Sequence, residues 1–286
     1  MLCQRYCSLF NLPANGKYHF IEGDILTADL DSIFSDAQVV IHLAAITDAA
    51  NSFSNEEVVN KTNYEGTKRI ADACMKNTVP LIFLSTTSVY GTQKEIVDEF
   101  CSKEELSPQS PYATSKLKSE TFLLQLKKDR DFPFVICRFG TIYGTSIGMR
   151  FHTAVNKFCW QAVNGQPITV WKTALNQKRP YLHLDDASNA IIHIIQKNLF
   201  NGDVYNVLTS NSTVQDIIDV IKEKIPTLSI QLTDNQIMNQ LSYNVSNDWF
   251  KKTGFTYHGS LKSGINDTLE LIGGISNWKD MGEKKR

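Results

Sequence analysis

Residues 83–116 decide the fold of this chain: they open with FLSTTSVYG at 83–91 and close with SPYATSK at 110–116. The apolar run LIFL just before the hydroxyl cluster is typical of a strand that is buried on both faces of a parallel sheet. Ser110 and Pro111 predict the N-cap and the first residue of a helix. The tyrosine and the lysine that follow are four residues apart, so they share one helical face.

This pattern is suited to proton transfer. A phenol with a pKa of ~10 is a poor base at neutral pH, and a nearby ammonium group lowers that pKa by favouring the phenolate. We expect Lys116 to act in this way on Tyr112, while a hydroxyl at the strand end, Thr86 or a neighbour, holds the substrate oxygen whose proton is exchanged. Such a relay oxidises an alcohol or reduces a ketone, with a cofactor carrying the hydride. The alternative is an ordinary tyrosine–lysine pair on a helix surface.

The composition indicates which classes of binding partner and which cell compartment to expect for this protein. The chain has 286 residues, 42 % of them hydrophobic, which suffices for one large domain or two smaller ones. Its net charge of -1 argues against nucleic acid or an anionic membrane as the main partner, and no run approaches ~18 apolar residues. The six scattered cysteines form no Cys-x-x-Cys motif, and the N-terminus lacks signal-peptide zones. We therefore expect a cytoplasmic protein with reduced thiols and no metal site.

Both segments resemble those of the extended short-chain dehydrogenase/reductases, the group that contains the NAD-dependent nucleotide-sugar epimerases and dehydratases. The resemblance covers most of the chain. It implies an α/β fold, a Rossmann-like doubly wound parallel sheet with a smaller C-terminal substrate lobe. The NAD-binding domain is expected to comprise residues 1–144 and 175–207, and the substrate lobe residues 145–174 and 208–286.

The resemblance also assigns roles to the three central residues. Tyr112 would be the catalytic acid/base, Lys116 its electrostatic partner and ribose contact, and Thr86 the hydroxyl that orients the sugar. The predicted function is that of an NAD-dependent nucleotide-sugar epimerase, an isomerase with oxidoreductase chemistry that transiently oxidises a sugar hydroxyl. Its partner would be a nucleotide-diphosphate sugar. The alternatives are an NAD(P)-dependent ketosugar reductase and a truncated, non-catalytic homologue that acts as a binding or dimerisation partner.

Other segments match the family's cofactor contacts. A strand expected at 18–21 precedes Gly-Asp-Ile, whose Asp24 would touch the adenine. A strand expected at 39–45 ends in small residues, which let a cofactor approach the backbone at the sheet's carboxyl edge. The helix expected at 56–75 carries the family's Asn-x-x-Gly-Thr, whose Asn63 supports the cofactor loop. The implied cofactor contacts are Asp24, Ile25, Leu43, Ala44, Ala45, Asn63, Tyr112 and Lys116.

Two residues in these segments are interpreted as structural. His42 lies within the expected strand, and we expect it to be a hydrogen-bonded core histidine rather than a catalyst. Gly66 lies within the expected helix, where the lack of a side chain favours close helix packing. Neither residue is therefore counted among the site residues.

The substrate contacts follow from the same resemblance. The run RFGTIYG at 138–144 resembles the family's Arg-x-x-Asn-x-Tyr-Gly, with Thr141 in place of the Asn that often contacts the sugar diphosphate. Arg179 matches an arginine that pairs with the diphosphate, and a planar guanidinium suits phosphate oxygens. Thr87 and Ser88 stand where the 4,6-dehydratases carry an Asp-Glu pair, which disfavours elimination of water. These four residues are the implied substrate contacts.

The rest of the chain alternates helix and strand patterns. A capping box in STVQ at 212–215 precedes apolar residues at helical spacing, which predicts a helix there. The further elements expected are a helix at 151–163, a strand at 167–171, a helix that ends at 196, a strand at 204–207 and a last helix at 261–272. The resemblance also implies a homodimer that pairs the helices at 56–75 and 111–128.

The family's glycine loop has no counterpart. No Gly-x-x-Gly-x-x-Gly run occurs among the 15 glycines, and only 22 residues precede Gly23, whereas a strand–helix–strand unit needs about 30. We therefore expect a sheet that lacks its first strand and glycine loop, through a wrong start site, a partial gene or a real shortened variant. Because the pyrophosphate would lose its cradle, we expect weak NAD binding. NADP remains an alternative cofactor, since the residue that selects between NAD and NADP lies in the missing part.

Overall fold

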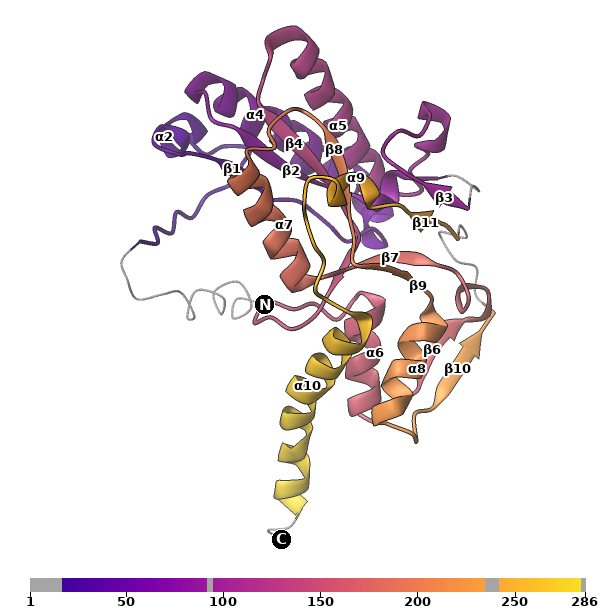
Figure 1. Ribbon diagram of the computed structural model, residues 1–286. Helices are drawn as coiled ribbons and strands as arrows, with labels where there is room; N and C mark the ends of the chain where they lie inside the picture. The colour runs from indigo at the N-terminus through magenta and orange to yellow at the C-terminus, as the bar shows by residue number, and fades with distance from the viewer. Residues whose placement is uncertain (1–16, 92–94, 235–241, 284–286) are drawn as a thin grey trace.

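A four-stranded parallel sheet forms the centre of the larger half of the molecule. The computed structural model describes residues 17–91, 95–234 and 242–283, with 275–283 as backbone only. The strand order is β1-β2-β4-β8. The strands are β1 (Val40–His42), β2 (Leu81–Thr86), β4 (Phe134–Phe139) and β8 (Val204–Val207). Figure 1 shows this sheet in the upper part of the molecule, with helices on both of its faces.

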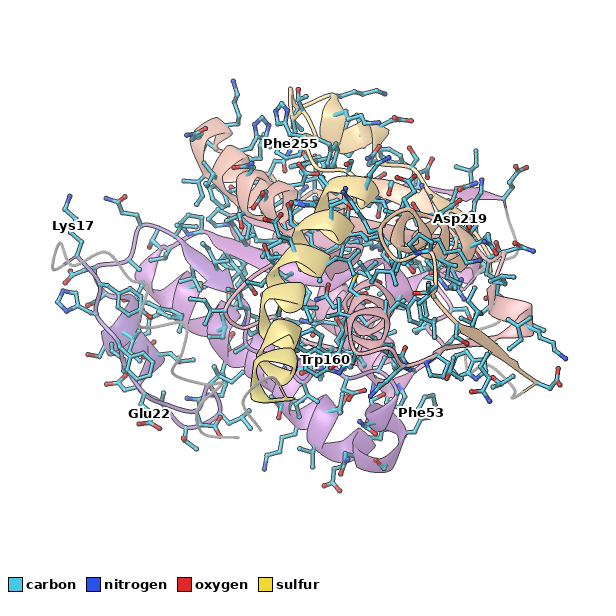
Figure 2. All side chains as sticks on the ribbon, turned by 90° about the horizontal axis from the view of Figure 1, so that it is seen from below. Lys17, Glu22, Phe53, Trp160, Asp219 and Phe255 are labelled. Carbon is cyan, nitrogen blue, oxygen red and sulfur yellow. The ribbon has the colours of Figure 1, made fainter. Side chains whose placement is uncertain are left out.

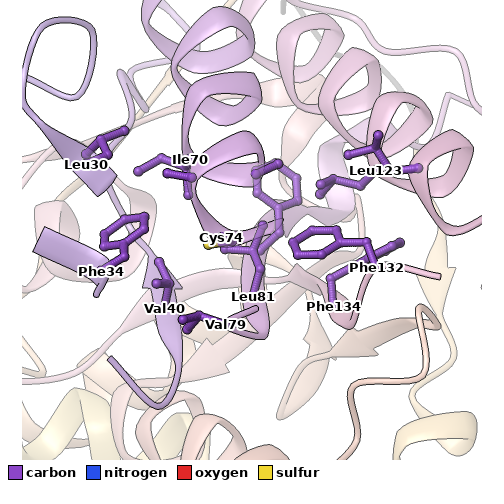
Figure 3. Close-up of a cluster of buried hydrophobic side chains, with 14 of the residues drawn as sticks. Leu30, Phe34, Val40, Ile70, Cys74, Val79, Leu81, Leu123, Phe132 and Phe134 are labelled. Carbon is purple, nitrogen blue, oxygen red and sulfur yellow. The ribbon is translucent and has the colours of Figure 1, made fainter. Parts of the chain in front are cut away.

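One face of the sheet is covered by three helices. They are α2 (Leu30–Phe34), α4 (Gly66–Asn77) and α5 (Pro111–Arg130). In Figure 3 their apolar side chains, among them Phe34, Ile70 and Leu123, gather over Leu81 and Phe134 of the sheet. Each fully buried side chain of this kind contributes roughly 1.5–3 kcal/mol, so this layer is a main source of stability.

The opposite face is covered by α7 (Leu184–Lys197) and α9 (Asp248–Lys251). Ile82, Val135 and Cys137 point to this face, where they pack with Ile194 and Phe250. Their sequence neighbours point to the other face, because successive side chains of a strand alternate. Both faces are therefore buried, and the predicted α/β, Rossmann-like doubly wound sheet is confirmed.

A smaller group of elements lies below the sheet in Figure 1. It contains α6 (Ala154–Val163), α8 (Val214–Lys224), α10 (Leu261–Glu283) and the parallel pair β6 (Ile168–Trp171) and β10 (Ile230–Thr233). Phe158, Ile217 and Ile265 from the three helices share one apolar cluster. Seen from below in Figure 2, α10 crosses this group beside Trp160 of α6. The domain boundaries expected from the sequence stay a prediction.

Two small sheets connect these parts. The first has the order β5-β7-β9, with β5 (Thr141–Tyr143) parallel and β9 (Ser210–Ser212) antiparallel to β7 (Arg179–His183). The second pairs β3 (Ile96–Val97) with β11 (Asn244–Val245). Short helical turns complete the chain: η4 (Thr87–Val89), η5 (Lys103–Glu105) and η6 (Lys172–Ala174).

The helix expected at 56–75 is present in three parts. After η2 (Asn51–Asn55), α3 (Glu56–Asn60) continues through a π-helical turn, η3 (Lys61–Glu65), into α4. Such π turns inside α-helices are rare and often lie near functional sites. A Cβ on Gly66 would lie 2.5 Å from Ile25 Cδ1, which confirms close packing as the role of this glycine.

Two local predictions are wrong. Residues 18–21 form no strand: Tyr18, Phe20 and Ile21 are exposed, and Figure 2 shows the adjacent Glu22 at the rim of the molecule. A strand needs a pairing partner, and among the described residues β1 pairs with β2 alone. The capping box is displaced by one residue, because Thr213 rather than Ser212 is the N-cap of α8.

Some chemical features of the described ranges bear on the class of protein. No helix in residues 17–91, 95–234 and 242–283 is long and apolar enough to cross a bilayer. Cys74, Cys101, Cys137 and Cys159 are free thiols in this part of the chain. Burial raises the pKa of the Cys74 thiol to about 12, so this thiol stays protonated and unreactive.

Candidate active site

The carboxyl ends of β2 and β4 open into a cavity of about 870 Å³, which is where doubly wound sheets bind their ligands. The cavity brings together most of the predicted site residues: Leu43, Ala45, Thr86, Thr87, Ser88, Tyr112, Lys116, Thr141 and Arg179. Four predicted residues do not line it: Asp24, Ile25, Ala44 and Asn63. The catalytic and substrate candidates therefore meet in one place, whereas part of the expected cofactor set lies outside it.

The first turn of α5 places Tyr112 at the cavity. The Ser110 hydroxyl accepts a hydrogen bond of 3.2 Å from Ala113 N, and Pro111 occupies the first helical position, as predicted. The backbone N–H of Tyr112 has no partner within the helix and instead donates to Ser52 Oγ at 3.3 Å. Ser52 comes from η2, so this bond joins α5 to the segment that follows β1.

The Thr86 hydroxyl is a neighbour of the Tyr112 phenol in the cavity wall and interacts with it. Thr86 Oγ1 accepts from Ser88 N at 3.1 Å, which leaves its own hydrogen free to be donated to the phenol oxygen. Burial raises the pKa of Tyr112 to about 12, and the interaction with Thr86 lowers it in part. In this structure Tyr112 is therefore a neutral phenol, the form that donates a proton.

Lys116 lies one turn further along α5 and is only 3 % exposed. Its ammonium donates to Leu84 O at 2.8 Å and lies 4.8 Å from the centre of the Phe83 ring. Burial lowers the pKa of Lys116 to about 8, against the charge of Glu120, which raises it. The expected lowering of the Tyr112 pKa by Lys116 is not seen, because burial dominates at Tyr112 and the ammonium donates to the Leu84 carbonyl instead.

A buried ionic network that the sequence reasoning missed lies behind Lys116. The guanidinium of Arg138 on β4 binds Glu120 of α5 with two short contacts, Nη2–Oε2 at 2.7 Å and Nε–Oε1 at 3.1 Å. Ser85 also donates to Glu120, and Arg138 donates to Tyr90 Oη at 2.9 Å. The sequence offered one signal for this network: Glu120 follows Lys116 by four residues, so both charges lie on the same face of the expected helix.

Asn63 organises the loop that follows β1. Its Oδ1 accepts from Ile46 N at 2.8 Å, and its Nδ2 donates to Ile46 O at 3.0 Å and to Ser115 Oγ at 3.0 Å. The side chain is buried and thus ties this loop to α5 without lining the cavity. The contacts support the loop-supporting role that the resemblance implies.

His42 has the structural environment expected for it. The ring is buried, and its Nε2 lies 3.0 Å from Thr67 Oγ1. Burial lowers the pKa of His42 to about 3, with a smaller contribution from Lys116, so the ring stays neutral. A neutral imidazole that is engaged with α4 is part of the core rather than a proton carrier.

The residues expected at the adenine end lie away from the cavity. Asp24 is exposed, and its Oδ1 accepts from Leu26 N at 2.9 Å, which stabilises a local turn. Ile25 packs against the apolar cluster that α2, α4 and α5 form on the sheet. The small residues after β1 and the pair Tyr112 and Lys116 nevertheless fit the nicotinamide and ribose end of NAD, since they offer close backbone approach and hydroxyl-binding groups.

The substrate end of the cavity is formed by β5 and β7. Arg179 Nη2 donates to Gln177 Oε1 at 3.1 Å, and its Cζ lies 5.7 Å from the ring centre of Tyr243. Thr141 on β5 lies beside β7. Thr87 is buried, and its hydroxyl donates to a backbone carbonyl, Phe139 O, at 3.3 Å. Tyr243 lines the cavity but has no signal in the sequence, because nothing local marks it as a partner of Arg179.

Comparison with known families agrees with this arrangement. The sequence profile of the NAD dependent epimerase/dehydratase family matches residues 2–207. The chain belongs to this family. Its members are NAD-dependent enzymes, so NAD is the cofactor expected for this cavity.

Curated relatives are similar over nearly the whole chain. The uncharacterized UDP-glucose epimerase YtcB of Bacillus subtilis is 27% identical over 94% of this chain and 84% of its own length. A trifunctional UDP-glucose 4,6-dehydratase/UDP-4-keto-6-deoxy-D-glucose 3,5-epimerase/UDP-4-keto-L-rhamnose-reductase of Arabidopsis thaliana, RHM3, is 29% identical over 96% of this chain. The chain spans 43% of the length of that plant protein.

Solved structures share the fold. The UDP-glucuronic acid 4-epimerase from Bacillus cereus, in complex with UDP-glucuronic acid and NAD, superposes with a TM-score of 0.86 at 24% identity, over 96% of this chain and 87% of that chain. DesIV, a dTDP-glucose 4,6-dehydratase from Streptomyces venezuelae with NAD and TYD bound, gives 0.84 at 20% identity, over 94% and 84%. At sequence identities of 24% and 20%, the structural similarity shows that the fold is shared.

Proposed function

We propose that this chain is a nucleotide-sugar epimerase that acts by transient oxidation of one sugar hydroxyl. The observation that carries the proposal is that the neighbouring Thr86 hydroxyl and Tyr112 phenol line the same cavity as Lys116 and Arg179. An acid/base pair at one end and a guanidinium at the other fit a substrate that has a reactive alcohol joined to a diphosphate.

The chemistry assigned to the chain's own residues is proton transfer. Bound NAD supplies the hydride acceptor and donor and, when oxidised, a positive charge that favours the Tyr112 phenolate. Tyr112 Oη would remove the proton from the sugar hydroxyl and return it to the same oxygen when the carbonyl is reduced again, and the face of the carbonyl carbon that receives the hydride decides whether the centre is inverted. Thr86 holds the same oxygen through its hydroxyl, and Lys116 fixes the end of β2 through the Leu84 carbonyl.

Elimination of water is the less favoured chemistry for this cavity. By the family resemblance, dehydration uses an Asp-Glu pair where this chain has Thr87 and Ser88. The cavity does contain the carboxyl group of Asp48, but Asn51 donates to it from its backbone at 3.0 Å and from its side chain at 2.6 Å. These bonds, with the backbone bond first, lower the pKa of Asp48, so it is a poor proton donor.

Arg179 is proposed as the diphosphate contact, with Thr141 and Ser88 as further substrate contacts. A nucleotide-sugar substrate would lie between this arginine and Tyr112. We also propose the domain division given by the resemblance and a homodimer that pairs α3 to α4 with α5. Val58 of α3 is exposed, which supports an outward-facing helical surface there.

A product assay tests the proposal. The protein is incubated with millimolar NAD and a panel of UDP- and dTDP-sugars, and the sugars are followed by proton NMR. We expect one sugar to give an isomer of equal mass with no net change in NAD. Net consumption of NADH with a ketosugar would instead identify a reductase. Failure to bind any nucleotide sugar or NAD would identify a non-catalytic homologue.

A further inference from the structure

Tyr243 occupies the wall between the two ends of the cavity. It lies directly before β11 and is only 3 % exposed. Its hydroxyl donates to Thr87 O at 3.2 Å, and its ring centre lies 5.7 Å from Arg179 Cζ. The Tyr90 ring packs edge-on against it at 6.4 Å. The side chain therefore has three contacts to three different segments of the chain.

Two of these contacts lead to opposite ends of the site. Thr87 follows Thr86 at the end of β2, so its carbonyl belongs to the turn that presents the catalytic hydroxyl. Arg179 opens β7, at the proposed diphosphate end. Tyr243 is therefore the side chain through which these two ends are connected across the cavity wall.

We propose that Tyr243 is a positioning residue that fixes the spacing between the acid/base end and the diphosphate end of the substrate. Its ring holds the Arg179 guanidinium in place, and its hydroxyl holds the turn after Thr86. This inference rests on the proposed function, because it takes Arg179 as the diphosphate contact. It assigns Tyr243 no contact with the reacting atoms.

The properties of Tyr243 suit this role. Burial raises the pKa of its phenol, against the smaller lowering effect of Arg179, so the hydroxyl stays protonated and remains a donor to the Thr87 carbonyl. The edge contact with Tyr90 restricts rotation of the ring. A long arginine side chain has high rotamer freedom, and an aromatic face within about 6 Å reduces it before the substrate binds. The guanidinium is thus oriented in advance.

The two halves of the role can be separated by substitution. Tyr243→Phe keeps the ring below Arg179 but removes the bond to Thr87. We expect kcat to fall about fivefold, the effect of one hydrogen bond, with KM for the nucleotide sugar within about twofold. Tyr243→Leu also removes the aromatic face. We expect it to raise KM and the Kd for free UDP or dTDP about tenfold, as for loss of a cation–π contact.

Binding is measured by calorimetry with UDP, dTDP and the corresponding nucleosides. The nucleosides lack phosphate, so their affinity should be equal in the wild type and in Tyr243→Leu. In a background of Arg179→Ala, Tyr243→Leu should have no further effect on the Kd for the diphosphate, because the ring acts through the arginine. Tyr257→Phe is the control for Tyr243→Phe, since Tyr257 is a half-buried tyrosine that does not line the cavity. Thermal unfolding checks that each variant is folded.

The outcomes separate this inference from the proposed function. If Arg179→Ala binds the diphosphate as the wild type does, or if the wild type binds neither nucleotide, the diphosphate site itself is wrong and the role of Tyr243 falls with it. If Arg179→Ala weakens binding while Tyr243→Leu does not, only the positioning role is overturned. Equal losses of nucleoside and nucleotide affinity in Tyr243→Leu would also overturn it, since they indicate a general structural effect.

Discussion

The wall of the cavity that β2 and α5 form is buried and cross-linked, whereas the wall at the end of β1 is open. On the first wall Thr86 and Lys116 are almost inaccessible, and each has a hydrogen-bond partner. On the second wall Leu43 is 64 % exposed. The acid/base groups are therefore held by the interior of the fold, while Leu43 and Ala44 of the expected cofactor set lie near its surface.

This difference follows from the position of the strands. β2 pairs with neighbours on both sides, whereas β1 is three residues long and, among the described residues, pairs with β2 alone. Within the described part of the chain, one side of β1 therefore has backbone groups without a partner strand. We therefore expect proton transfer to be the better organised part of the site and NAD affinity to be the weaker one.

The largest expected effect concerns NAD affinity. Charged hydrogen bonds are worth roughly 1.5–3 kcal/mol each, so the lack of a glycine loop should weaken a micromolar site about thousandfold or more. A titration of the 286-residue chain with NAD, followed by protein fluorescence, should give a millimolar Kd. A Kd in the low micromolar range would mean that another segment binds the pyrophosphate and that the two walls are equally complete.

The next effect concerns the buried support of the β2–α5 wall. Glu120→Gln leaves the Arg138 guanidinium buried without its countercharge. We expect urea denaturation to show a free energy of unfolding that is lower by about 3–5 kcal/mol. The control is Glu65→Gln, which breaks an exposed pair with Lys68 and should change it by less than about 1 kcal/mol. Similar losses in both variants would show that this wall has no special stability.

The pH dependence of stability tests the burial of Lys116. Burial lowers its pKa to about 8 in the folded state, whereas the unfolded lysine titrates at its ordinary 10.5. Between these values the unfolded state binds more protons, so stability should rise with pH, by on the order of 3 kcal/mol across the whole window. Urea unfolding at about pH 7 and about pH 9.5 should show this gain in the wild type but not in Lys116→Met. A gain of equal size in both proteins would remove Lys116 as its source.

The smallest effect concerns substrate affinity. Arg179→Ala should weaken nucleotide-sugar binding by about 1.5–3 kcal/mol, as for one charged hydrogen bond, and leave NAD affinity nearly unchanged. Lys172→Ala is a suitable control, because Lys172 pairs with Asp234 and does not line the cavity. Calorimetry that shows equal affinity in the wild type and in Arg179→Ala would remove the arginine from the site.

The two walls also differ in how well the sequence predicts them. The start of α5 was predictable because Ser110 and Pro111 are local signals, and the buried strand before it because its apolar run is continuous. The contact of Tyr243 with Arg179 was not, because cation–π partners distant in the chain leave no local pattern. The prediction of a strand at 18–21 was wrong because strand formation also depends on distant residues. A β pattern forms a strand only where a partner strand lies beside it.

The electrostatics of the site could be predicted only in part. The pairing of Tyr112 with Lys116 on one helical face was correct, but the direction of the Tyr112 pKa shift was not. The sequence gives the spacing of charges, whereas the pKa also depends on how deeply each group is buried and on where the ammonium points. The sequence could not indicate that the Lys116 ammonium donates to the Leu84 carbonyl.

The central claim is that Tyr112 is the acid/base of a redox reaction on a nucleotide sugar. Its most direct test is the steady-state turnover of Tyr112→Phe with the best nucleotide sugar, at an NAD concentration well above the measured Kd. Loss of the phenol oxygen should reduce kcat by a factor on the order of 10²–10⁴, the usual size for one acid/base group. The Kd for the nucleoside diphosphate should stay the same. Near-normal turnover in this variant would contradict the account.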